Sequence, residues 1–162
     1  MARSSFVSFH YDNDHWRVQQ VLKFGAIEGE SILPAQKWEE VKEDGDDAVE
    51  EWINSEMKYK QAVIVLIGSE TASRKFVKYE IKRAWSIKKP LLGIRINGLK
   101  DSNGKTSTAG ANPFAQFGFS DSEKTYADYV PVYTPSGADS SAVYADIKAN
   151  IETWIANGYK QP

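Results

Sequence analysis

The stretch Ala62-Val-Ile-Val-Leu-Ile67 decides the fold class. It is apolar at every position, is rich in β-branched residues and shows no alternation with polar side chains. A strand with this pattern is typical of a parallel sheet that is covered on both faces. A second apolar run follows at Leu91–Ile96. Lys89-Pro90 ends the helical pattern between the two runs, because proline disfavours helix in the residue before it.

Strand and helix periodicities alternate on both sides of this stretch. A first strand is predicted at Ser5–Phe9, and the helix after it is capped by Asp12 or Asp14, although these two carboxylates could instead form a catalytic pair. A weak second strand is predicted near Ala26–Leu33, where Pro34 ends it. Three further helices are predicted: one from Asp46 or Asp47, one over Thr71–Ile87 and one from about Ser140. An edge strand is predicted at Tyr129–Tyr133, and a long connection runs from Asn97 to about Lys124.

This alternation predicts an α/β fold of the flavodoxin-like, doubly wound kind, with five parallel strands in the order 2-1-3-4-5 and helices on both faces. A chain of 162 residues fits one domain, so residues 1–162 are predicted to form a single unit. Ligands of such folds bind where the strand order reverses, beyond the carboxyl ends of the first and third strands. The segments at that position are His10-Tyr-Asp-Asn-Asp14 and Gly68 to Glu80.

Composition argues against several classes of function. The net charge is −2, from 20 basic and 22 acidic residues mixed along the chain, so we expect no nucleic-acid partner. There is no cysteine, and His10 and His15 lack a clear set of co-ligands, so we expect no metal site. The apolar runs are too short to cross a bilayer and the first residues do not resemble a signal peptide. We therefore expect a cytoplasmic protein with no membrane partner.

The helix predicted at Thr71–Ile87 carries one flank of particular interest. Ser73, Phe76 and Glu80 recur at i, i+3 and i+7, which brings them to one side of a continuous helix. That side could face the crevice beside the first strand. Spacing alone leaves an alternative open, in which Glu80 pairs with Arg83 on a solvated helix surface.

Three segments carry a family resemblance. Val65-Leu-Ile-Gly-Ser-Glu-Thr-Ala-Ser-Arg-Lys-Phe-Val-Lys-Tyr-Glu80-Ile resembles the strand-to-helix segment of Toll/interleukin-1-receptor (TIR)-like proteins. Ser5-Phe-Val-Ser-Phe-His-Tyr-Asp12 resembles the first strand of that family and the loop after it. Leu92-Gly-Ile-Arg-Ile-Asn-Gly-Leu-Lys-Asp101, followed by Gly110-Ala-Asn-Pro-Phe114, resembles a bacterial and archaeal branch that includes the sensor subunit of the Thoeris antiphage system. The resemblance implies a single TIR-like domain.

The resemblance also implies a site and a reaction. TIR enzymes of this kind cleave the nicotinamide–ribose bond of NAD⁺, which is a substrate, and no other cofactor is implied. The catalytic glutamate of the family falls on Glu80, and Phe76 takes the place of an aromatic residue that is tryptophan in many active members. The other expected substrate-binding residues are Phe9, His10 and Tyr11 at the end of the first strand, Asn13, and the hydroxyl-bearing Ser69, Thr71 and Ser73.

In the function that this resemblance implies, NAD⁺ is converted to a cyclic ADP-ribose signal that activates a separate effector protein. The family also implies self-association and a phage component as the trigger. Residues 25–45 depart from the family, because they show no clear TIR-type loop after a second strand. Two other functions stay open: a non-catalytic adaptor module and a sensor that binds a nucleotide without cleaving it. A recessed Glu80 near aromatic residues favours the enzyme, whereas an exposed pair between Glu80 and Arg83 favours the adaptor.

Overall fold

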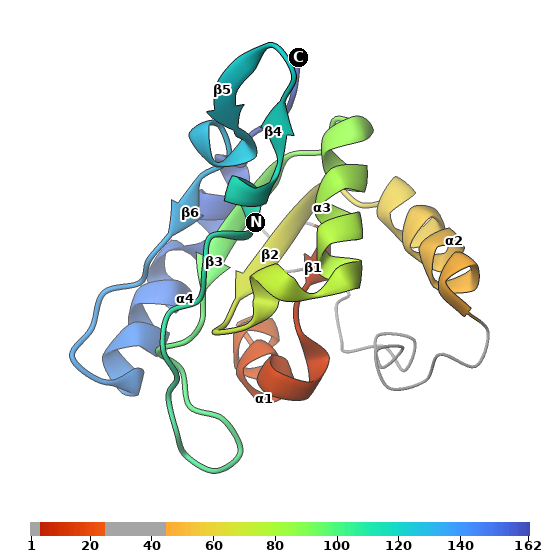
Figure 1. Cartoon of the computed structure of the whole chain (residues 1–162). Helices are drawn as coiled ribbons and strands as arrows, with labels where there is room; N and C mark the ends of the chain where they lie inside the picture. Colours follow the sequence, from red (N-terminus) through yellow and green to blue (C-terminus); the bar gives the residue numbers. More distant parts are fainter. Residues whose placement is uncertain (1–3, 25–44) are drawn as a thin grey trace.

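Four parallel strands form the central sheet of the computed structural model, which describes residues 4–24 and 45–162 (Figure 1). Their order across the sheet is β1-β2-β3-β6, with β2 and β3 in the middle of the four. Val65 in β2 aligns with Ser8 at the end of β1 and with Gly93 in β3. The strands are β1 (Ser5–Ser8), β2 (Ala62–Ile67), β3 (Leu91–Arg95) and β6 (Val132–Tyr133).

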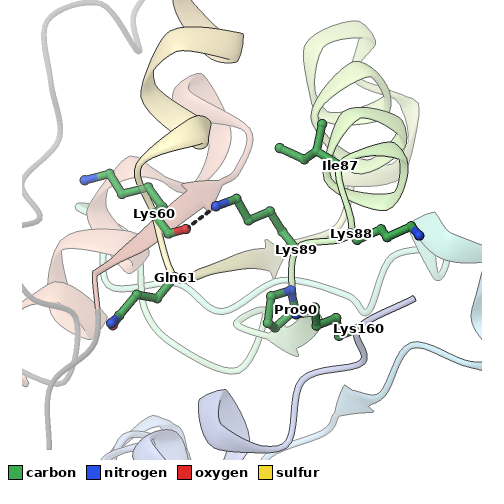
Figure 2. Close-up of a pocket in the computed structure, with 7 residues that line it drawn as sticks. All are labelled: Lys60, Gln61, Ile87, Lys88, Lys89, Pro90 and Lys160. Atoms are coloured by element: carbon green, nitrogen blue, oxygen red, sulfur yellow. Dashed lines mark hydrogen bonds between the residues drawn. The ribbon is translucent and has the colours of Figure 1, made fainter. Parts of the chain in front are cut away.

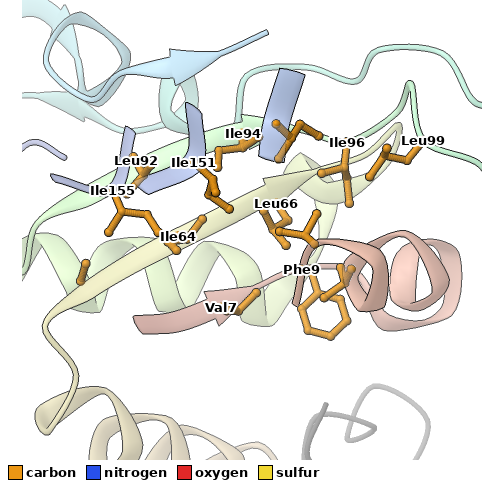
Figure 3. Close-up of a cluster of buried hydrophobic side chains, with 14 of the residues drawn as sticks. Val7, Phe9, Ile64, Leu66, Leu92, Ile94, Ile96, Leu99, Ile151 and Ile155 are labelled. Carbon is orange, nitrogen blue, oxygen red and sulfur yellow. The ribbon is translucent and has the colours of Figure 1, made fainter. Parts of the chain in front are cut away.

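Helices cover both faces of the sheet. Helices α1 (Tyr11–Leu22) and α4 (Ser140–Ala156) pack on one face, and α2 (Gly45–Lys58) and α3 (Lys75–Ser86) pack on the other. Figure 3 shows the core of the first face, where strand residues such as Ile64 and Leu66 lie against Ile151 and Ile155 of α4. All six residues of β2 are buried, because alternate side chains enter the two cores. The α/β prediction and the buried parallel strand are therefore confirmed.

The predicted five-strand order is confirmed only in its coarser form, a parallel α/β sheet. The weak second strand predicted at Ala26–Leu33 lies outside the described residues. The four described strands keep the relative order predicted for the first, third, fourth and fifth strands. The edge strand predicted at Tyr129–Tyr133 is shorter than expected, because Tyr126–Asp128 form a 3₁₀ turn and only Val132–Tyr133 pair with β3.

Two predictions about helix ends are wrong. The N-cap position of α1 is His10 and the helix already begins at Tyr11, so neither Asp12 nor Asp14 is its cap. The helix predicted over Thr71–Ile87 is divided into a 3₁₀ turn, η2 (Thr71–Ser73), and α3. Arg74 separates them with an extended backbone, φ −78° and ψ 131°. The Thr71 hydroxyl accepts a hydrogen bond from the Gly68 amide, a local contact that competes with helix formation.

The long connection between β3 and β6 contains short elements of its own. A 3₁₀ turn, η3 (Pro113–Gln116), precedes the antiparallel hairpin of β4 (Gly118–Phe119) and β5 (Ser122–Thr125), and η4 (Tyr126–Asp128) follows. Figure 1 shows this hairpin and the C-terminus at one end of the sheet. Helix α1, the start of α3 and the loop that follows β3 lie at the opposite end, where β1 and β2 finish.

Candidate functional site

The carboxyl ends of β1 and β2 are neighbours, so the segments that follow them meet at one edge of the sheet. A hydrogen bond joins these segments directly, since the Asn13 side-chain amide donates to the Ser69 hydroxyl at 3.1 Å. Asn13 and Ser69 are both half-buried. The structure thus brings together two of the predicted substrate-binding residues, at the position where doubly wound folds bind their ligands.

Glu80 is recessed behind this edge. Its exposed fraction is 3%, and the Ser8 hydroxyl donates a hydrogen bond to Oε1 at 2.7 Å. Ser8 is the last residue of β1, so the contact fixes the carboxylate of α3 against the end of the first strand. The alternative in which Glu80 lies on an open helix surface is therefore wrong. A recessed Glu80 is the arrangement that favours the enzyme hypothesis over the adaptor.

The predicted residues on α3 and η2 occupy different environments. Phe76 is 3% exposed and belongs to the core under α2 and α3, one helical turn before Glu80. Thr71 is fully buried, and its hydroxyl stabilises the turn at Gly68. Ser73 is exposed and donates to the Glu70 carbonyl at 2.9 Å. The break at Arg74 separates Ser73 from the helix, so the predicted flank contains only Phe76 and Glu80.

The predicted aromatic residues at the end of β1, Phe9 and Tyr11, both pack with the core of α1 and α4. Phe9 is 8% exposed and packs in the core of α1 and α4, on the face of the sheet opposite Glu80 (Figure 3). Tyr11 is half-buried and stacks on the His15 ring, with centroids 4.8 Å apart. His10 is 5% exposed at the start of α1. Their roles in substrate binding stay predictions.

A buried ion pair lies beside these residues, and the sequence analysis did not assign it a role. Asp14 is fully buried and Arg17 is 2% exposed. The Nη1 group of Arg17 donates a hydrogen bond to Asp14 Oδ1 at 2.9 Å. Burial raises the pKa of the Asp14 carboxyl above its ordinary value, and the neighbouring guanidinium offsets only part of that effect. The i, i+3 spacing of an acid and a base within this helix was the signal available in the sequence.

The loop after β3 covers the turn that follows β2. Gly110 lies against this turn so closely that a Cβ atom there would stand 2.4 Å from the Gly68 carbonyl oxygen. An Arg95 Nη1 donates to the Gly110 carbonyl at 2.7 Å and holds the loop in this position. Gly68 in turn packs on the Asp14 carboxylate, and a Cβ atom at Gly68 would overlap Asp14 Oδ2. Only glycine therefore fits at positions 68 and 110 without a shift of the backbone or of its neighbours.

We expect Gly110→Ala to destabilise the protein by about 1–3 kcal/mol, because the added methyl group forces the backbone of this tightly packed contact apart. The measurement is the midpoint of urea unfolding. Gly118→Ala is the matched control, since the nearest atom to a Cβ at that glycine is 3.9 Å away. Equal midpoints for the two variants would contradict the close packing of Gly110 on the Gly68–Ser69 turn.

Two pockets of the described residues lie away from Glu80, at the amino ends of the strands. Figure 2 shows one of about 550 Å³ beside Lys60, Lys88, Lys89 and Pro90. Its ammonium groups do not converge: those of Lys60 and Lys88 point in opposite directions, and that of Lys89 is bound by the Lys58 and Lys60 carbonyls. The other pocket, of about 310 Å³, is lined by Trp85, Phe119, Asp121, Ser122, Tyr129, Tyr159, Gln161 and Pro162.

Comparison with known proteins adds two findings. A family model described as "Thoeris protein ThsB, TIR-like domain" matches residues 6–101. A protein of Bacillus cereus (strain MSX-D12) named "Putative cyclic ADP-D-ribose synthase ThsB1" is 33% identical over 129 residues. The match covers 74% of this chain and 65% of that relative. In the described part of the chain, no helix has the length and apolar character needed to cross a membrane.

Proposed function

The chain belongs to the TIR-like family of the Thoeris protein ThsB, and from this premise we propose that it cleaves the nicotinamide–ribose bond of NAD⁺ and forms a cyclic ADP-ribose signal. The observation that carries the proposal is the placement of Glu80, buried and bonded to Ser8 at the carboxyl edge of the sheet. The name of the Bacillus cereus relative supports the same reaction class.

The reaction needs few protein groups. When the bond between the ribose C1′ and the pyridinium nitrogen breaks, the electron pair stays on nicotinamide, which leaves as a neutral molecule without a general acid. Positive charge then develops on the ribose, as in glycoside hydrolysis. The Glu80 carboxylate supplies the opposite charge, and its exclusion from bulk water makes the attraction stronger than it would be on a solvated surface.

The product depends on which oxygen attacks the ribose carbon. Attack by water gives ADP-ribose and releases one proton. Attack by a hydroxyl of the same ADP-ribose moiety closes a ring, gives a form of cyclic ADP-ribose, which contains one water less than ADP-ribose, and also releases one proton. In the role proposed here, the cyclic product is the signal, a separate effector protein binds it, and a phage component triggers its synthesis.

The residues around Glu80 supply the expected contacts with the substrate. Ser8 orients the carboxylate, and the linked side chains of Asn13 and Ser69 present polar groups at the edge where the ribose and phosphates bind. Tyr11, on the same helix as Asn13, adds a half-buried aromatic ring that stacks on His15. His10, Thr71, Ser73, Phe76 and Phe9 complete the proposed set: His10, Thr71 and Phe76 are buried, Ser73 is exposed, and Phe9 acts only through the core on the face of the sheet opposite Glu80.

We expect the turnover rate per molecule to rise with protein concentration, because self-association is proposed to complete the site. The measurement is nicotinamide release per mole of protein across a dilution series, with the oligomeric state followed by light scattering on the same samples. A constant rate per molecule down to dilutions that contain only monomer would contradict the role of assembly.

The experiment that tests the proposed function directly is NAD⁺ consumption in lysates of phage-infected cells that produce this chain. Nicotinamide and a cyclic ADP-ribose product should both accumulate, and uninfected cells should show less of each. Production of the Glu80→Gln variant at the same level is the control. NAD⁺ that stays constant in every lysate would contradict the proposed function.

A further inference from the structure

We propose that Arg17 is a positioning residue: it holds the segment 97–112 against the carboxyl edge of the sheet and thereby controls how much water reaches the reacting ribose. This inference rests on the proposed function, which supplies the reaction, and the contacts that carry it are independent of that function. It concerns how the enzyme divides its product between the cyclic form and linear ADP-ribose.

One guanidinium joins α1 to two points of the loop after β3. Arg17 Nε donates to the Leu99 carbonyl at 2.8 Å, and an Arg17 Nη2 donates to the Lys105 carbonyl at 2.9 Å. The Asp101 carboxylate lies 3.8 Å from the same guanidinium. These partners are more than 80 positions away in the sequence. Arg17 therefore fixes both sides of the turn at 99–105 to helix α1, which also carries Asn13.

Asp14 fixes the guanidinium in turn. Its Oδ1 accepts from Arg17, and its Oδ2 has no hydrogen-bond partner among the described residues and is packed against Gly68. A carboxylate that is fully buried and pressed on a glycine has little freedom to move. The pair of Asp14 and Arg17 therefore connects the loop after β3 with the turn after β2.

The rest of the segment reaches Ser69. Ser107 and Asn97 bind each other twice, through the Ser107 amide to the Asn97 carbonyl and through the Asn97 side chain to the Ser107 carbonyl. Three residues later, Gly110 lies on the carbonyl groups of Gly68 and Ser69. Segment 97–112 thus forms a wall over the turn whose Ser69 side chain contacts Asn13.

A wall in this place affects the product more than the bond cleavage. Cyclisation and hydrolysis share the step that releases nicotinamide, and they differ only in the attacking oxygen. A closed wall excludes water and leaves the internal hydroxyl as the nearest attacking group. A loosened wall admits water, so the ratio of linear to cyclic product rises. Because this is a ratio of two products of the same enzyme, it does not depend on how much of the enzyme is folded.

The test variant is Asp14→Asn combined with Arg17→Met, because it removes the contacts of the guanidinium without leaving an unpaired buried charge. Gln20→Ala is the matched control. Gln20 is on the same helix and also donates to this loop, at the Lys100 carbonyl, but through an exposed hydrogen bond. Both variants are compared with the unaltered chain under identical conditions of activation.

Two readouts decide the outcome. We expect the linear-to-cyclic product ratio of the double variant to rise severalfold, and amide exchange to accelerate in residues 97–112 but not in β2 or α4. Gln20→Ala should change neither. An unchanged ratio in an active double variant, or unchanged exchange in the segment, would overturn the proposal. If the unaltered chain forms neither product, the proposed function fails, and the exchange measurement still shows whether Arg17 holds the segment.

Discussion

Replacement of Glu80 by glutamine is expected to lower NAD⁺ cleavage by roughly 10²–10³-fold, the usual effect of removing one group that stabilises charge in the transition state. Glutamine has nearly the same shape and its side-chain oxygen can still accept the hydrogen bond of Ser8, so the fold should be retained. The negative charge beside the ribose is the property that changes. The measurement is the initial rate of nicotinamide release by the activated enzyme, with circular dichroism to show that the variant is folded.

Glu70→Gln is the matched control for this prediction. Glu70 also lies after β2, at the start of η2, but its side chain is exposed. Its removal should leave the rate close to that of the unaltered enzyme, because solvent screens its charge. Equal rates for Glu80→Gln and the unaltered chain, in a folded protein, would mean that Glu80 is not the catalytic carboxylate.

The second large effect is on stability. Arg17→Met is expected to destabilise the protein by about 3–5 kcal/mol, because it leaves the buried Asp14 carboxylate without its cation. In a chain of this length the loss corresponds to a fall in the melting temperature of roughly 6–20 °C. The methionine keeps much of the volume of the arginine stem, so the effect reports on charge and hydrogen bonds more than on packing. Thermal unfolding followed by circular dichroism is the measurement.

The double variant of Asp14→Asn and Arg17→Met separates the two contributions. It should recover much of the stability lost in Arg17→Met, since no unpaired charge remains in the core. A double variant as unstable as the single one would mean that the hydrogen bonds to Leu99 and Lys105, and not the stranded carboxylate, dominate the effect. A single variant as stable as the unaltered chain would contradict the burial of the pair.

The parts of the fold that the sequence predicted well are those set by long apolar patterns. The run at Ala62–Ile67 could only be buried on both faces, and β2 is buried at all six positions. The helix predicted from about Ser140 is α4, which packs Val143, Ile147, Ile151 and Ile155 against the sheet. A long apolar pattern of this kind is set by burial and depends little on local hydrogen bonds. The elements that it predicts are therefore found in the folded chain.

The predictions that failed depended on local competition. Thr71 bonds to the Gly68 amide and η2 ends at Ser73, so the helical pattern that runs from Thr71 in the sequence begins as α3 only at Lys75. Asp14 was expected at a helix end, but its contact with Arg17 places it in the core. Periodicity alone does not distinguish a capping carboxylate from a buried one, and the i, i+3 spacing of Asp14 and Arg17 was the one signal in the sequence for the buried pair.

The candidate site was likewise predicted only in part. Glu80 follows from the motif, and its depth beside Ser8 agrees with the enzyme hypothesis. Phe9 was expected beside Glu80, whereas its ring packs on the other face of the sheet. The contribution of the loop after β3 could not be predicted, because Arg17 and its partners at Leu99 and Lys105 are far apart in the sequence.

The measurement that tests the central claim most directly is mass spectrometry of the products formed from NAD⁺ by the purified chain, concentrated and supplied with lysate from phage-infected cells. The account predicts nicotinamide together with a cyclic ADP-ribose isomer, and neither above background with Glu80→Gln. Intact NAD⁺ with the unaltered chain, under conditions in which it assembles, would contradict the account and favour a non-catalytic adaptor.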